Sequence, residues 1–308
     1  MEILVRNETF AFEIERFYGH FVNELKLTNK SKYTIISYNT TIKSFIAFIR
    51  EYEKPISFDN LKKIDIMNFL EYKNEKLEKH TELEMSSKKL YITHLKTFFT
   101  FINENLDVDI KLSTIFKINI KLQKRTPKGV EKDDVKILEK YLANLNFNSF
   151  INIRSSMILK ILLYTGARRG ELEVLQTKDF YEDEELYVIN TIGKGDKERT
   201  LYIPKMYIEK ELSYYLNHGI KYVASTKSGK TMDGSQIYRF LNKIYKKIGI
   251  KYSGAHILRH TFAKSMIAKD VNIVTVKELL GHANIQTTMI YTNPNQKEVQ
   301  KAYLNAIK

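Results

Sequence analysis

The clearest chemical pattern in the chain lies near its end, where a Leu-Leu-Gly-His run closes at His282 and Tyr291 follows nine residues later. A tyrosine hydroxyl is a poor nucleophile at neutral pH because its pKa is about 10, so a reactive one needs cationic and hydrogen-bonding neighbours. Three upstream stretches could supply them: Thr-Gly-Ala-Arg-Arg-Gly-Glu-Leu at 165–172, Gly-Lys-Gly at 193–195 and His-Ile-Leu-Arg-His at 256–260. Arginine, lysine, histidine and tyrosine are together the groups needed to cut a phosphodiester without a metal.

Each stretch alone also has an ordinary structural interpretation. Thr-Gly-x-Arg after an apolar segment is typical of a helix end, and the glycines around Lys194 are too few for a phosphate-binding loop. His256 and His260 lie four residues apart, as zinc ligands on a helix do, but the metalloprotease motif needs a glutamate directly after the first histidine, and residue 257 is Ile. We therefore predict no metal site and no cofactor. Tyr291 itself is one of 20 tyrosines.

Helices must position these groups, and residues 1–120 predict a domain of four. Apolar residues recur at intervals of three and four, which is typical of amphipathic helices with one buried face. Pro55 breaks the pattern between the second and third helix, and Ser86 is the expected N-cap of the fourth. The expected helices lie at about 8–27, 34–50, 62–79 and from 86 to about 102.

A basic stretch at 121–130 that contains Pro and Gly is the expected linker to a second domain at 131–308. In that domain, residues 186–192 and 199–203 predict a β-hairpin with Lys194 at its bend, and 221–225 predict a third strand. Gly166 should end a buried helix in the left-handed conformation. Further helices are expected at about 131–145, 151–164, 234–248, 255–268, 272–280, 285–292 and 297–307, with a short one beginning at Gly170. The fold class is therefore mainly α with a small antiparallel β-sheet, in two domains.

Composition favours a soluble protein that binds a polyanion. The 308 residues include 50 Lys and Arg against 36 Asp and Glu, a formal net charge of +14. Nucleic acid is the simplest partner for such a surface because each neutralised phosphate releases counterions, although lysines can also serve only to keep a protein dispersed. No apolar run reaches the roughly 20 residues of a membrane helix. The N-terminus lacks the layout of a signal peptide, so we expect a cytoplasmic protein without a membrane partner.

Four basic residues are candidates for contacts to nucleic acid. Lys43 lies on the polar side of the second expected helix, and Lys89 and Lys96 share one face of the fourth. Arg169 follows the first arginine of the 165–172 stretch. Such residues are consistent with a solvated surface or with contacts to phosphates, and both interpretations stay open.

In this order and spacing, the motifs resemble those of the tyrosine recombinase (phage integrase) family, most closely its bacterial Xer-type members. The resemblance covers nearly the whole chain and implies a helical core-binding (SAM-like) domain, a basic linker and a tyrosine recombinase catalytic domain with a C-terminal tail helix. Ala255 replaces a common proline and Arg169-Gly170 replaces the usual aliphatic-Ser pair, but neither change removes a catalytic group. His260 is assigned a structural role. By position in the family motifs, the catalytic residues are Arg168, Lys194, His256, Arg259, His282 and the nucleophile Tyr291.

The activity that the resemblance implies is site-specific DNA recombination through a 3′-phosphotyrosine intermediate and a free 5′ hydroxyl. The arginines and His282 would bind the phosphate, His256 would accept the tyrosine proton and Lys194 would protonate the leaving oxygen. The resemblance also implies a homo-tetramer on two double-stranded DNA sites, joined by docking of the 295–308 tail, with a DNA translocase as a candidate activator. Chromosome dimer resolution is the expected role. The alternatives are integration or excision of a mobile element, a type IB topoisomerase and a DNA-binding module without catalysis.

Overall fold

Aromatic and aliphatic side chains at helical spacing build the core of the first part of the chain. In the computed structural model, this part forms α1 (Glu2–Leu27), α2 (Lys32–Glu51), α3 (Lys63–Glu75), α4 (Met85–Asn105) and the single-turn α5 (Leu112–Ile115). Their inner faces meet in one core in which Phe45, Phe69, Phe98 and Phe99 are fully buried. The four long helices are those that the periodicity predicts, and α5 is an addition.

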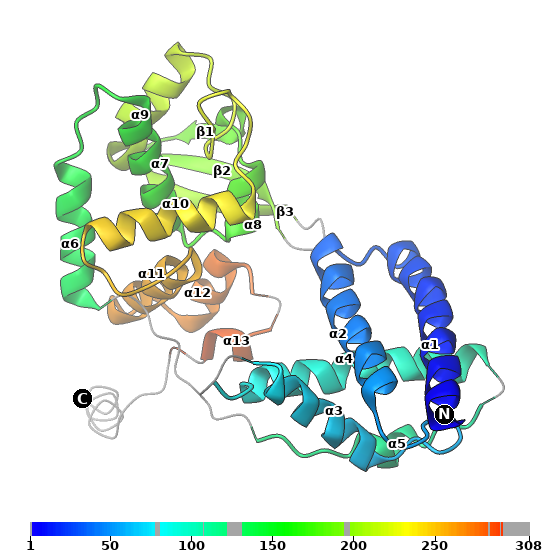
Figure 1. Ribbon diagram of the computed structural model, residues 1–308. Coiled ribbons are helices and arrows are strands. Elements are labelled where there is room, and N and C mark those ends of the chain that lie inside the picture. The colour runs from blue at the N-terminus through cyan, green and yellow to red at the C-terminus, as the bar shows by residue number, and fades with distance from the viewer. Residues whose placement is uncertain are drawn as a thin grey trace, which may run out of the picture. The chain divides into compact units, whose positions relative to one another are not determined.

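The structure describes residues 2–77, 81–106, 108–121, 131–193, 198–282, 284–289 and 291 (Figure 1). The chain divides into two units, Met1–Lys124 and Arg125–Lys308, each with its own core. The linker expected at 121–130, apart from Lys121, the hairpin bend at Lys194 and the tail helix expected at 297–307 lie outside the described residues. None of the described helices is long and apolar enough to cross a membrane.

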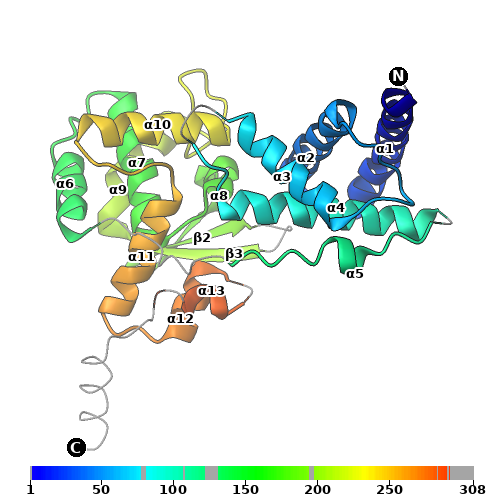
Figure 2. The ribbon, with the colours of Figure 1, turned by 60° about the horizontal axis from the view of Figure 1, so that its bottom comes forward.

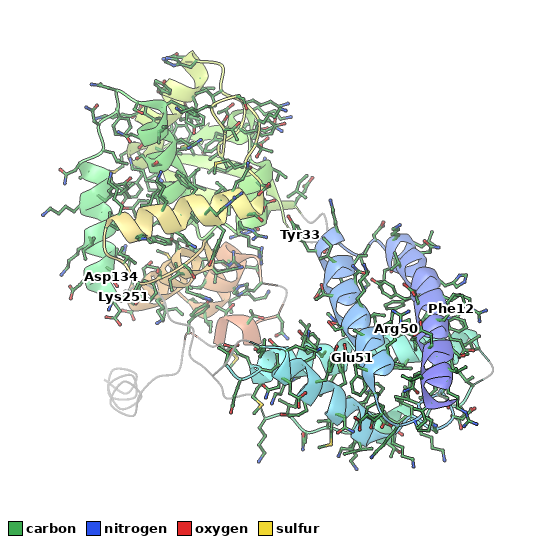
Figure 3. The ribbon with its side chains drawn as sticks, in the orientation of Figure 1. Phe12, Tyr33, Arg50, Glu51, Asp134 and Lys251 are labelled. Carbon is green, nitrogen blue, oxygen red and sulfur yellow. The ribbon has the colours of Figure 1, made fainter. Side chains whose placement is uncertain are left out.

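Polar side chains fix how α1 and α2 pack. Asn7 is buried, donates to two backbone carbonyls just after α2 and accepts from the backbone N–H of Ile56. Arg50 reaches from α2 toward α1 (Figure 3), where its Nε lies 3.1 Å from a carboxylate oxygen of Glu8. These ties hold the first turns of α1, which explains why the helix begins at Glu2 rather than at the expected residue 8.

The N-cap expected at Ser86 is wrong. α4 begins at Met85 after Glu84, and Ser86 lies in its first turn. The hydroxyl of Ser86 donates to the carboxylate of Glu84 at 3.0 Å instead of accepting from a backbone N–H. Because the Ser86 hydroxyl is bonded to the Glu84 carboxylate, it does not cap the helix, and the general preference of serine for N-caps does not determine where α4 begins.

α7 (Phe150–Thr165) runs through the second unit as the buried helix that the sequence predicts, since most of its residues are buried. α9 (Lys205–Asn217), α11 (His256–Ala268) and β3 (Glu198–Pro204) pack against it (Figure 1). Gly166 ends α7 with a φ of 62°, as predicted, and a Cβ there would lie 2.6 Å from the ring of Phe262. The unit also contains α6 (Lys132–Ala143), α8 (Arg169–Val174), a 3₁₀ helix (Thr177–Asp179), α10 (Gly234–Lys247), α12 (Ile273–Leu280) and α13 (Gln286–Met289).

The sheet confirms the predicted hairpin but not the predicted third strand. β1 (Phe180–Asp183), β2 (Leu186–Ile192) and β3 form an antiparallel sheet in the order β1-β2-β3. β1 was missed because it is only four residues long and its last three residues are exposed, so it shows no alternation of buried and exposed positions. Segment 221–225 makes only single bridges, at Tyr222 and Ser225, and its apolar residues are buried as part of the core rather than in a strand. The prediction of a mainly α protein with a small antiparallel sheet is confirmed.

α9 was not predicted, because a charge interrupts its buried face. Glu211 lies on α9 between apolar positions and is 1% exposed. It accepts from Lys160 and Ser156, both on α7, and these partners make a carboxylate acceptable in the core. These partners lie about 50 residues earlier in the sequence. The residues of α9 alone therefore show an apolar face that a glutamate interrupts, which does not predict a buried helix.

Candidate active site

The loop that follows α7 places Arg168 at the start of α8. Its backbone N–H donates to Oε2 of Glu171 at 2.7 Å, and its Nη1 donates to Oε1 of the same carboxylate at 2.8 Å. Its Nη2 donates to the carbonyl of Gly281 at 2.5 Å. The side chain keeps 27% of its surface exposed, so the guanidinium is held on one side and open on the other.

Two further arginines reach the same place from α11 and β3. Arg259 is buried and donates to the carbonyl of the glycine that ends α7, at 2.7 Å, and to the carbonyl of Leu280, at 2.5 Å. Arg199 donates to Oε2 of Glu171 at 2.5 Å and to the carbonyl of Leu279. The three arginines therefore come from three separate elements of the unit.

The carboxyl end of α12 is their common acceptor. The carbonyls of residues 279, 280 and 281 accept from Arg199, Arg259 and Arg168 in turn. The last carbonyls of a helix lack partners within the helix and carry partial negative charge, so they attract guanidinium groups. Gly281 ends α12 with a φ of 60°, and a Cβ there would lie 2.7 Å from the side chain of Arg199. Figure 2 shows α11, α12 and β3 meeting in this region.

The cluster holds three guanidinium groups and one buried carboxylate, Glu171, which pairs with Arg168 and Arg199, so it carries an excess of positive charge. Burial raises the pKa of Glu171, but the charge of Arg199 and hydrogen bonds from two arginines outweigh it and hold that pKa below its usual value. Burial, followed by the charges of Arg168 and Arg199, lowers the pKa of Arg259 to about 9, which leaves it cationic at neutral pH. A phosphodiester fits such a cluster, because planar guanidinium groups donate paired hydrogen bonds to phosphate oxygens.

Thr288, buried in α13, connects His282 to Tyr291. Its hydroxyl lies 2.8 Å from Nδ1 of His282, and its carbonyl accepts from the backbone N–H of Tyr291 at 3.0 Å. On the other side, the hydroxyl oxygen of Tyr291 lies 2.5 Å from Nδ1 of His260 on α11. The tyrosine is thus held by its backbone and by its hydroxyl.

The histidines around the cluster are kept neutral. Burial and then the charge of Arg259 lower the pKa of His256 and, to about 4, the pKa of His282. Burial raises the pKa of the Tyr291 hydroxyl, and Arg259 opposes it. Neutral imidazoles can exchange hydrogen bonds and take up protons. Within the described ranges, no three His, Asp or Glu side chains form a group that could hold a metal ion.

The residues singled out from the sequence fall into four groups. Lys194 lies outside the described residues. Arg169 pairs with Glu173 at 3.2 Å, and its charge acts on His256. The exposed lysines Lys43, Lys89 and Lys96 lie on α2 and α4 of the first unit. The residues that the structure brings to the arginine cluster are Arg168, His256, Arg259, His282 and Tyr291.

Sequence reasoning missed three contributions to the site. Glu171 stands three residues after Arg168, a spacing from which a carboxylate caps the start of a helix, and this was a usable signal. Arg199 shares a face of β3 with the buried Leu201, so the strand prediction already placed it on the inner side. His260 was assigned a structural role, whereas its ring contacts the hydroxyl of Tyr291. No signal in the sequence distinguishes it from a structural histidine.

Two family models match the chain. The model of the phage integrase family matches residues 128–298, which include the whole arginine cluster. The model of the phage integrase N-terminal SAM-like domain matches residues 19–105. Both matches therefore fall where the sequence motifs place the two parts of such a protein.

Relatives point to the same family, and a solved structure shares the fold. Tyrosine recombinase XerH of Campylobacter jejuni is 32% identical over 238 residues, which are 71% of this chain and 65% of that protein. Tyrosine recombinase XerC of Staphylococcus aureus is 28% identical over 298 residues, 93% of this chain and 94% of that protein. The crystal structure of XerH bound to a palindromic difH substrate, a post-cleavage complex, shares the fold with a TM-score of 0.80 at 22% identity, over 97% of this chain and 96% of that one. The chain belongs to the phage integrase family of tyrosine recombinases, enzymes that cleave and rejoin DNA.

Proposed function

We propose that this protein is a site-specific recombinase that cuts double-stranded DNA with Tyr291, holds one end as a 3′-phosphotyrosine and rejoins it to a different end. The observation that carries the proposal is the arginine cluster beside the tyrosine, in which Arg168 and Arg199 share the carboxylate of Glu171 while Arg259 is held by backbone carbonyls. A structural tyrosine needs no such excess of cations. A nucleophile that attacks a phosphodiester does, because negative charge builds up on the phosphate oxygens in the transition state.

Each side chain is given the role that its contacts allow. Arg168, which is partly exposed, donates to a non-bridging oxygen of the phosphate. Arg259 is buried, but its hydrogen bonds go to backbone carbonyls rather than to a carboxylate, so its charge is not neutralised and its remaining N–H groups donate to the phosphate as well. Arg199 is enclosed by Glu171 and the end of α12, so it positions the other arginines and does not reach the substrate. The Nδ1 of His282 is engaged by the threonine of α13, which leaves Nε2 to donate to a phosphate oxygen.

The reaction exchanges one phosphodiester for another. The hydroxyl oxygen of Tyr291 bonds to phosphorus, the bond from phosphorus to the 5′ oxygen breaks, and the leaving oxygen takes a proton. Lys194 is the proposed donor of that proton. The covalent link conserves the energy of the phosphodiester bond, so rejoining requires no nucleotide.

The exposed lysines of the first unit are the proposed contacts to DNA phosphates. Lys43 lies on α2, and Lys89 and Lys96 lie on α4, all three in contact with solvent. Such contacts position a protein on DNA without reading its sequence. Arg169, paired with Glu173 in the free protein, would exchange that carboxylate for a phosphate.

We also infer an Xer-type role, chromosome dimer resolution in the cytoplasm. The support is that relatives named XerH and XerC align at 32% and 28% identity, the second over 93% of this chain. In this role the protein acts as a homo-tetramer on two DNA sites, with residues 295–308 docked on a neighbouring copy and a DNA translocase as activator. Integration or excision of a mobile element uses the same chemistry and is the alternative. The DNA joined to Tyr291 in cells separates them: one chromosomal site supports dimer resolution, and the ends of an element support the alternative.

Capture of the covalent intermediate tests the proposed chemistry. The protein is expressed in its host, the cells are lysed in denaturant with EDTA, and the DNA that stays attached is sequenced. An oligonucleotide of that sequence, nicked to trap the cut strand, then measures adduct formation in vitro. We expect an adduct with the wild-type protein in EDTA and none with Tyr291→Phe. Tyr181→Phe, on the exposed β1, is the matched control and should behave like wild type.

Three results would contradict the proposal. An adduct that survives in Tyr291→Phe excludes this nucleophile, and an adduct that needs a divalent ion excludes the metal-free chemistry. Tight DNA binding without any adduct indicates a DNA-binding module. Relaxation of any supercoiled plasmid, regardless of its sequence, indicates a type IB topoisomerase instead.

A further inference from the structure

The hydroxyl of Tyr291 has a partner that the expected mechanism does not use. Its oxygen lies 2.5 Å from Nδ1 of His260, and the two ring centroids are 5.6 Å apart with their planes at 54°. We propose that His260 is the catalytic base that takes the proton of Tyr291 when the tyrosine attacks the DNA phosphate. This inference rests on the proposed function, and it replaces His256 in the role of base.

Both partners of this contact are firmly held. His260 lies on α11 directly after Arg259, whose guanidinium is tied to the ends of α7 and α12. The ring of Tyr291 packs against the apolar cluster that contains Phe262 and Leu280, and its backbone N–H is bound within the same turn. The contact therefore joins a packed tyrosine to a histidine on a helix that its neighbour Arg259 anchors, and proton transfer in a transition state requires such positioning.

His256, one helical turn earlier on α11, faces the arginines instead. The charges of Arg259, Arg169 and Arg168 act on it, whereas the hydroxyl of Tyr291 is affected by Arg259 alone among the arginines. Residues four apart share one face of a helix, so both histidines face the site but lie one turn apart along α11. This arrangement assigns His256 to the phosphate and His260 to the nucleophile.

The surroundings of His260 favour the neutral form that a base needs. Burial lowers its pKa first, followed by the charges of His256, Arg259 and Lys264. His282, from the end of α12, also faces it. A neutral imidazole with its proton on Nε2 offers the lone pair of Nδ1 to the tyrosine hydroxyl. A bound phosphate would raise the pKa of His260 toward its ordinary value by offsetting the arginine charge.

The step balances within the site. The O–H bond of Tyr291 breaks and its proton moves to Nδ1 of His260, while the tyrosine oxygen forms its bond to phosphorus. The bond from phosphorus to the 5′ oxygen breaks, and Lys194, the proposed acid, protonates that oxygen. In rejoining, a 5′ hydroxyl gives its proton to Lys194 as its oxygen bonds to phosphorus. The bond from phosphorus to the tyrosine oxygen breaks, and His260 returns its proton to that oxygen.

Single-turnover cleavage by His260→Asn tests this role. Asparagine can accept a hydrogen bond near the position of Nδ1 but cannot take up the proton. We expect the cleavage rate constant at pH 7 to fall about 10²-fold, with unchanged DNA affinity. The defect should shrink as the pH approaches that of tyrosine ionisation, because hydroxide then removes the proton. His218→Asn, at the exposed end of α9, is the matched control and should keep the wild-type rate.

A substrate with sulfur at the bridging 5′ position separates the two proton transfers. Thiolate leaves without being protonated, so this substrate should rescue Lys194→Ala and should not rescue His260→Asn. Rescue of both variants would place His260 on the side of the leaving group and overturn the proposal.

The remaining outcomes are equally decisive. A wild-type rate in His260→Asn shows that the contact is not used, and a higher rate shows that it restrains the tyrosine; either overturns the proposal. If His260→Asn does not fold, imidazole added to His260→Gly gives the same test: restored cleavage supports a base, and no restoration excludes it. The absence of any adduct with the wild-type protein counts against the recombinase function itself.

Discussion

α7 contributes to two buried charge clusters that are built on different principles. At its middle, Lys160 pairs with Glu211 of α9 at 2.5 Å, and Ser156 donates to the same carboxylate. One cation there faces one anion. Beyond its C-terminal end, three guanidinium groups surround one carboxylate. Arg168 and Arg199 pair with Glu171, and all three arginines donate to carbonyls at the end of α12.

The difference separates a structural charge cluster from a functional one. A balanced pair satisfies a buried carboxylate and is explained by the fold alone. An unbalanced cluster opposes folding, since like charges repel, and clusters of this kind are typical of sites that bind a ligand of opposite charge. The same type of substitution made in each cluster should therefore have different effects on stability, on cleavage activity and on the response to anions.

Glu171→Gln and Glu211→Gln should have the largest effects. Removing one partner of a buried pair costs about 3–5 kcal/mol of unfolding free energy in other proteins. Glu171→Gln should cost more than Glu211→Gln, because it leaves Arg168 and Arg199 without their carboxylate and beside the charge of Arg259. Sulfate should restore much of the stability of Glu171→Gln and little of that of Glu211→Gln, because only the arginine cluster can bind a tetrahedral anion.

Urea unfolding with and without sulfate measures both effects. Sodium chloride at the same ionic strength is the control for screening. Equal responses of the two variants to sulfate would show that the anion acts on the protein in general and would remove the distinction between the clusters.

Arg168→Gln and Arg154→Gln compare an arginine of the proposed active site with an arginine that packs in the core. Arg154 lies on α7 between the rings of Phe150 and Phe240 and donates to the carbonyl of Ser225. Arg168→Gln should lower the cleavage rate roughly 10²–10³-fold, as the loss of one preorganised donor does elsewhere, while the unfolding free energy changes by less than about 1 kcal/mol. Arg154→Gln should lower stability and keep the cleavage rate of the folded protein. The reverse pattern in single-turnover cleavage and urea unfolding would contradict both assignments.

The helices that carry the site can be predicted from the sequence, because the pattern of their own residues favours a helix and marks its end. α11 has an apolar face at helical spacing, and Gly166 is the residue type that a left-handed helix end favours. α9 cannot be predicted in this way, because its buried Glu211 is stabilised only by hydrogen-bond partners on α7. Local rules therefore predict elements well where each element buries its own apolar face.

The contacts of the site depend on the tertiary fold, and spacing alone does not reveal them. Arg168 and the carbonyl of Gly281 are 113 residues apart, and Arg199 and the carbonyl of Leu279 are 80 residues apart. His256 and His260 share one face of α11, so only the path of the chain after α12 determines which of them meets the tyrosine. The sequence identified the motif residues but did not reveal which histidine contacts the hydroxyl of Tyr291.

The smallest expected effect is on the pH dependence of stability, and it comes from comparing His282 of the arginine cluster with His94 of the first unit. Burial lowers the pKa of His94, which hydrogen-bonds Thr41 and stacks on Tyr38 in the first unit. Burial also lowers the pKa of His282, but there the arginine cluster contributes, and the value falls to about 4. The folded state thus keeps His282 neutral, whereas the unfolded chain takes up a proton near pH 6.5.

The sign of the pH dependence follows from this difference in proton binding. Between pH 6.5 and about 4, the unfolded state binds more protons at residue 282, so the unfolding free energy falls as the pH is lowered through this window and is fully retained above it. For a half-buried ring, solvent screening reduces the loss to about 1–2 kcal/mol, and His282→Asn should remove it from urea unfolding measured across the window. Sulfate should raise the pKa of His282 in an NMR titration, because it neutralises the arginines that lower it, and should leave the pKa of His94 unchanged. Equal shifts at both histidines would mean that sulfate acts on the whole protein, and no shift at His282 would mean that burial alone, without the arginines, holds its pKa low.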